Sequence, residues 1–144
     1  MNNEIATIPN LAKYNGVADL VAVRRDAQKY PRINATPFDE AVAKMTPIIH
    51  AAFLYRGQDA SELTIRFIAN ALVSEILTDT KCGLATLSWV EIGMAIRNAV
   101  LGEAREFYGV SVATLYGALV DYAKTDGHAA DVKAAQKPLN PISK

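Results

Sequence analysis

The amino-acid sequence predicts an all-α fold, a single compact bundle of about five helices with an irregular N-terminal arm and a flexible C-terminal tail. Apolar residues recur at spacings of three and four over most of the chain. Helix-capping residues precede several of these stretches, and no segment alternates apolar and polar residues as a half-buried strand does. The expected domains are residues 1–36 for the arm with one helix, 37–126 for the bundle core and 127–144 for the tail.

Composition predicts an ordinary globular domain with one core. The chain has 144 residues, of which 51% are hydrophobic and 21% charged. Fifteen basic residues balance fifteen acidic ones, so no net field draws the whole protein to nucleic acid. A single cysteine, a first segment without a secretion-signal pattern and the lack of a long apolar run predict a cytoplasmic protein that does not span a membrane.

The N-terminal arm has helix breakers at both ends of one apolar stretch. We expect a helix from about Ala18 to Lys29 there. The following segment, YPRINATP, reads as an extended connection across the surface, because proline disfavours helix at the residue before it.

The first bundle helix begins at Pro37. Its apolar residues share one face and are Phe38, Val42, Met45, Ile49, Ala52 and Phe53. Pro47 lies inside this stretch, so we expect a kink or a restart of the helix there, and Gly57 is the expected stop.

The second bundle helix is expected to be the central one. Asp59 and Glu62 have the spacing of a capping box. Two adjacent apolar stripes follow, the first with Leu63, Phe67, Ala71 and Ile76, the second with Ile65, Ile68 and Leu72. Two stripes predict contacts on both sides of this helix.

Two further helices follow. Ser88 and Glu91 form a second capping-box pattern, and the buried face after it is predicted to hold Trp89, Ile92, Ala95, Ile96 and Val100. Gly109 then makes a turn, Ser111 caps the last helix, and the helical period fits Val112, Leu115, Leu119 and Tyr122. The pattern fades past Asp126.

The inventory of reactive residues argues against an enzyme. Neither His50 nor His128 has a partner at metal-ligand spacing, and Cys82 beside a glycine is typical of an inert thiol. No glycine-rich phosphate loop occurs. We therefore expect a protein without catalytic activity or cofactor.

Residues 102–122 resemble a helix-turn-helix motif. The turn glycine, the buried residue after it, the cap and the first turns of the second helix match in order at Gly109, Val110, Ser111, Thr114, Leu115 and Leu119. The segment departs from the motif at Arg105, where a small residue usually stands. The helix from Val112 to Tyr122 also lacks the basic residues that contact DNA and carries Asp121.

A wider stretch, from about Leu63 to Tyr122, resembles small helical proteins of phages, prophages and mobile elements of Bacteroidetes-type bacteria. The matching residues are Glu91, Ile92, Ala95, Gly102, Glu103, Phe107, Tyr108, Gly109, Ser111 and Tyr122. The resemblance implies a replication accessory similar to helicase loaders.

These observations favour a non-enzymatic helical adaptor, a phage or mobile-element replication accessory that contacts a protein partner. The candidate contact residues are Arg105, Tyr108, Val112, Tyr116 and Val120. The alternative is a helix-turn-helix transcriptional regulator, for which the candidate nucleic-acid contacts are Arg24, Arg25, Lys29, Arg32 and Thr114. An apolar patch in GALVDYA leaves a homo-oligomer open as well.

Overall fold

The computed structural model describes residue 23, residues 28–102 and residues 109–127. Four α-helices lie in this part of the chain: α3 (Phe38–Tyr55), α4 (Glu62–Thr78), α5 (Trp89–Val100) and α6 (Val112–Tyr122). Two short 3₁₀ turns, η2 (Ile33–Ala35) and η3 (Leu84–Thr86), and a π-helical turn, η4 (Ala123–Gly127), accompany them. The all-α prediction is confirmed, since the described residues contain no strand.

The expected arm helix and tail lie mostly outside the described residues. Val23 is helical and buried, whereas Gln28 and Lys29 form a turn, so the helix does not reach Lys29 as expected.

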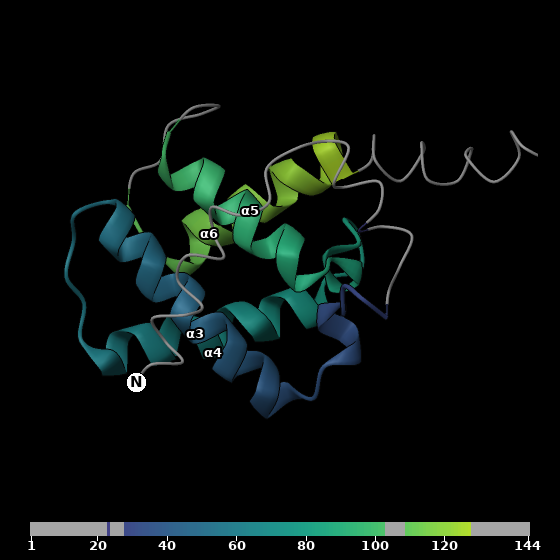
Figure 1. Ribbon diagram of the computed structural model, residues 1–144, viewed down its shortest axis with the longest axis horizontal. Coiled ribbons are helices and arrows are strands. Elements are labelled where there is room, and N and C mark those ends of the chain that lie inside the picture. Colours follow the sequence, from purple (N-terminus) through teal and green to yellow (C-terminus); the bar gives the residue numbers. More distant parts are fainter. Residues whose placement is uncertain (1–22, 24–27, 103–108, 128–144) are drawn as a thin grey trace, which may run out of the picture.

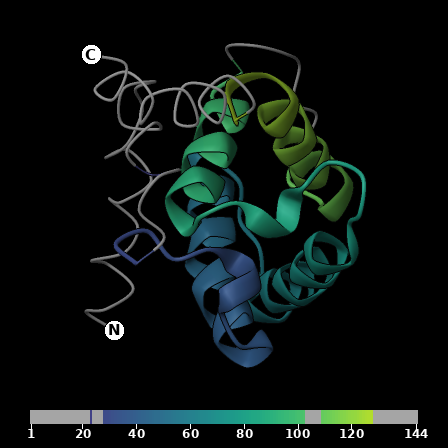
Figure 2. The same cartoon turned by 90° about the vertical axis from the view of Figure 1, so that its right-hand side faces the viewer.

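The four helices form a closed ring around one core. α3 packs against α4, α4 against α6, α6 against α5, and α5 against α3. In Figure 2 the four helices surround the core, and the teal α4 lies between the blue α3 and the yellow-green α6 (Figures 1 and 2). Each helix therefore has a buried side toward the ring centre. Of the helices described, none combines the length and the apolar character needed to cross a membrane.

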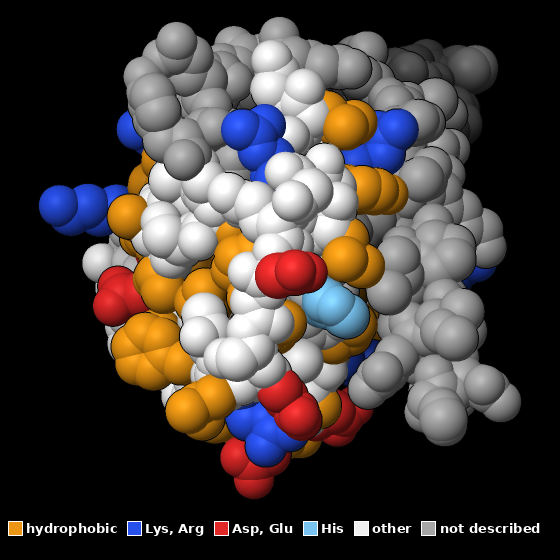
Figure 3. Space-filling model, turned by 90° about the vertical axis from the view of Figure 1, so that its left-hand side faces the viewer, with side chains coloured by type: hydrophobic (Ala, Val, Ile, Leu, Met, Phe, Trp, Pro, Cys, Tyr) orange, Lys and Arg blue, Asp and Glu red, His pale blue; other side chains and the backbone are white. Residues whose placement is uncertain are grey.

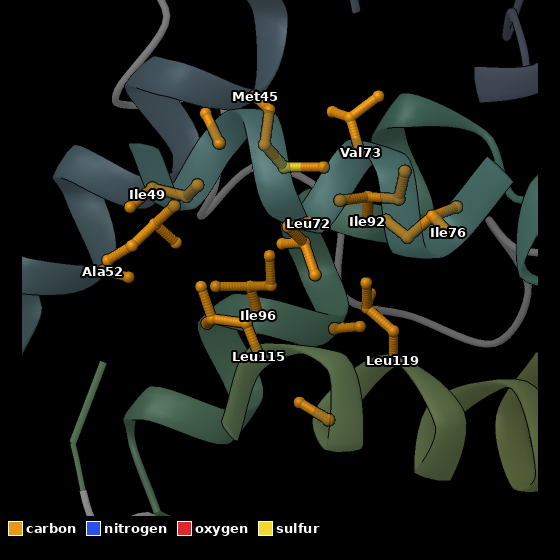
Figure 4. Packing of buried hydrophobic residues seen from close by; sticks show 14 of the residues in the cluster. Met45, Ile49, Ala52, Leu72, Val73, Ile76, Ile92, Ile96, Leu115 and Leu119 are labelled. Carbon is orange, nitrogen blue, oxygen red and sulfur yellow. The ribbon is translucent and has the colours of Figure 1, made fainter. Parts of the chain in front are cut away.

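The core is a continuous set of aliphatic side chains from all four helices. Met45 and Ile49 of α3, Leu72 and Ile76 of α4, Ile92 and Ile96 of α5, and Leu115 and Leu119 of α6 are each 0% exposed. Figure 4 shows these side chains converging between the helices. Burying one such side chain is worth about 1.5–3 kcal/mol, so this cluster is the main source of stability.

Helix α3 is continuous through Pro47. Of the two outcomes expected there, a kink or a restart, the restart does not occur. Pro47 has no N–H to donate to the carbonyl of Ala43, four residues earlier. Ala43 is exposed, so water can hydrate that carbonyl and reduce the cost. Phe38, expected in the core, is 40% exposed at the first turn, while Met45, Ile49, Ala52 and Phe53 are buried as predicted.

Helix α4 differs from its prediction at its start and on its outer side. The cap is Ser61, whose hydroxyl accepts the amide hydrogen of Thr64 at 3.1 Å, so the expected box of Asp59 and Glu62 is wrong. Leu63 and Phe67 are 79% and 67% exposed. Because α3 and α6 lie toward the same side of α4, the helix has one buried face, and contact on both sides was the wrong expectation.

Helices α5 and α6 begin where their caps predict. The Ser88 hydroxyl accepts the amide hydrogen of Glu91 at 3.2 Å, and the Glu91 carboxylate accepts that of Ser88 at 2.9 Å, which completes a capping box. Ser111 and Thr114 cap α6 in the same reciprocal way. The predicted buried face of α5 is also confirmed, apart from Trp89, which is half-buried.

The connection before α3 is part of the core, not only a surface crossing. Ile33 is 0% exposed, and its amide donates to the carbonyl of Leu87 at 2.9 Å. The amide of Trp89 donates to the carbonyl of Pro31 at 3.1 Å, and the Trp89 indole donates to the hydroxyl of Thr36 at 3.0 Å. This segment is thus bound to the start of α5.

The carboxylate of Glu91 lies inside the bundle, although a capping residue is normally exposed. Glu91 is 1% exposed, and its second oxygen accepts the hydroxyl hydrogen of Tyr122 at 2.7 Å. Tyr122 is the last residue of α6 and is itself buried. One side chain therefore joins the start of α5 to the end of α6.

We expect Tyr122→Phe to lower the free energy of unfolding by about 1–3 kcal/mol, because the buried carboxylate loses a donor while the ring is kept. Chemical denaturation measures this difference. Tyr55→Phe is the matched control, since Tyr55 is 38% exposed and its change is expected to stay within about 0.5 kcal/mol. Equal stabilities for the two variants would contradict a structural role for this hydrogen bond.

Candidate protein-contact surface

The surface predicted on α6 is already partly covered by the chain itself. Val112, Tyr116 and Val120 are half-buried and pack against the core, whereas Ala113 is exposed. The other two predicted contact residues, Arg105 and Tyr108, lie outside the described residues. The part of α6 that a partner can contact is therefore smaller than the apolar sequence of this helix indicates.

Tyr116 is bound through its hydroxyl to the loop after α4. The hydroxyl donates to the Asp79 carboxylate at 3.2 Å, and the same carboxylate accepts the amide hydrogens of Cys82 and Leu84, each at 3.1 Å. Asp79 is the C-cap of α4, so it shapes the turn into η3 and at the same time ties α6 to α4.

These hydrogen bonds shift the pKa values of both Asp79 and Tyr116. Burial acts to raise the pKa of Asp79, but the hydrogen bonds from Leu84, Cys82 and Tyr116 outweigh it, so the pKa lies below the ordinary value. Burial, and then the hydrogen bond to Asp79, raise the pKa of Tyr116 above its ordinary value. Both shifts keep Asp79 ionised and Tyr116 protonated at neutral pH, which is the state that the hydrogen bond requires.

The residues of the nucleic-acid alternative are only partly described. Arg24 and Arg25 lie outside the described residues. Lys29 is exposed, with its ammonium 5.7 Å from the centre of the Tyr30 ring, and Arg32 is half-buried beside Ser88. Thr114 has its hydroxyl within the α6 cap, where it contacts Ser111 and the Gly109 carbonyl.

The most exposed large hydrophobic side chains among the described residues are Leu63 and Phe67 on α4. The others, each at most 49% exposed, are Phe38, Leu54, Tyr55 and Leu101. Figure 3 looks onto the end of the molecule where α3 leads into α4. It shows hydrophobic side chains at the surface beside acidic and basic ones. Leu63 and Phe67 lie one turn apart on α4 and are therefore the candidate contact residues of the described part of the chain.

The outward face of α4 is the part of the site that the sequence prediction missed. Leu63, Phe67, Asn70 and Ser74 follow at spacings of four, three and four, which places them on one side of the helix. This stripe lies opposite the buried residues Ile65, Ile68, Leu72 and Ile76. The sequence shows two apolar stripes on this helix, and their spacing alone carries no signal as to which of them is buried.

A groove of about 390 Å³ lies beside this face, between α3 and the first turns of α4. Pro47 and Ile65 supply apolar lining, while His50, Glu62 and Arg66 supply polar groups. Arg66 and Glu62 form an ion pair at 2.9 Å, so the two charges largely offset each other. The lining thus combines apolar groups with polar groups, and the paired charges leave no strong net field.

Within the described residues, no group of three or more His, Cys, Asp or Glu side chains could hold a metal ion. Cys82 is half-buried, and its amide is bound to Asp79.

Comparisons with protein-family models, with curated proteins and with solved structures find no match to this chain. The resemblance to phage and mobile-element proteins therefore stays an expectation from the sequence.

The lowered pKa of Asp79 predicts how acid affects stability. Folding favours the ionised carboxylate, so this contribution is complete above the ordinary pKa of Asp, about 3.9, and is lost as the pH falls through the lower pKa of the folded protein. The substitution Asp79→Asn removes this contribution of the ionised carboxylate to the free energy of unfolding. We expect the variant to be less stable than the natural protein at pH 7 and the difference to shrink below about pH 4.

Urea denaturation of both proteins across this pH range measures the difference between their free energies of unfolding. The contributions of all other carboxyl groups cancel in this comparison. A difference that stays constant with pH would contradict the assigned role of the Asp79 charge.

Proposed function

We propose that this protein is a non-enzymatic helical adaptor that acts through protein–protein contact. The observation that carries the proposal is the exposure of Leu63 and Phe67 on the outward face of α4. Leaving two large apolar side chains in water forgoes about 1.5–3 kcal/mol each, which a partner surface can recover. The class of partner implied by the sequence resemblance is a replication protein of a phage or mobile element.

The α4 face is better suited to this role than the α6 surface on which the sequence prediction placed it. Tyr116 is bound to Asp79, and Val112 and Val120 pack against the core. A partner that took hold of these three residues would have to compete with contacts inside the chain. Leu63 and Phe67 are largely exposed, so a partner can contact them without breaking contacts inside the chain.

The DNA-binding alternative gains no specific support from the described residues. The described helix α6 has no basic residue and carries an exposed Asp121, so its surface opposes a phosphate backbone. Adaptor function remains the proposal that the exposed side chains favour.

A photo-reactive residue in place of Asn70 tests the proposal, because Asn70 is exposed and lies in the α4 stripe. In nuclease-treated extract we expect a discrete cross-linked protein product that disappears when Leu63→Ser and Phe67→Ser are added. The two serine changes should alter the free energy of unfolding by no more than about 0.5 kcal/mol each, since both sites are exposed.

The matched control carries the photo-reactive residue at Lys44, which is exposed on α3. The same products from both positions, or a product that survives the two serine changes, would contradict a contact surface on α4.

A further inference from the structure

We draw no further inference here: the strongest candidate, the groove between α3 and the first turns of α4, carries none, because its Glu62 and Arg66 side chains are already paired with each other and nothing in the described part of the chain shows what fills it.

Discussion

One buried carboxylate joins the start of α5 to the end of α6. Glu91 is 1% exposed, and its two oxygens accept hydrogens from the Ser88 amide and the Tyr122 hydroxyl. The residues beside Ser88 bind the segment before α3, through Leu87 with Ile33 and Trp89 with Pro31. Burying a polar side chain costs free energy unless such hydrogen bonds are kept. The Glu91 side chain therefore joins α5 to α6, and the backbone bonds of Leu87 and Trp89 add the segment before α3.

This constraint decides which surface is left for function. Helix α6 is held near its end by Tyr122 on Glu91 and near its middle by Tyr116 on Asp79. Its apolar residues are consequently committed to the core, although their sequence pattern is that of a contact helix. Helix α4 contributes one face to the same ring and leaves the opposite face uncovered, with Leu63 and Phe67 toward solvent. The adaptor role that we propose therefore uses α4.

The helices themselves could be predicted because their signals are local. Ser88 and Ser111 begin α5 and α6 as their capping patterns indicate, and the period of three and four identifies Ile92, Ile96, Leu115 and Leu119 as core. The ring could not be predicted, because it depends on contacts between distant residues. Sequence spacing cannot tell which of two apolar stripes on one helix is buried, so contacts were expected on both sides of α4, including the side of Leu63 and Phe67. Likewise, the capping pattern predicted the bond between Glu91 and Ser88, but only the position of Tyr122, 31 residues later, explains the burial.

Amide hydrogen exchange of the natural protein and a Glu91→Ala variant tests the dependence on this carboxylate most directly. We expect the variant to lose protection selectively in α6 and at the amides of Ile33 and Trp89, while α3 and α4 keep theirs, since a sub-global opening exposes only the segments that the carboxylate joins. A uniform loss across all four helices, or protection that does not change in α6, would contradict the account.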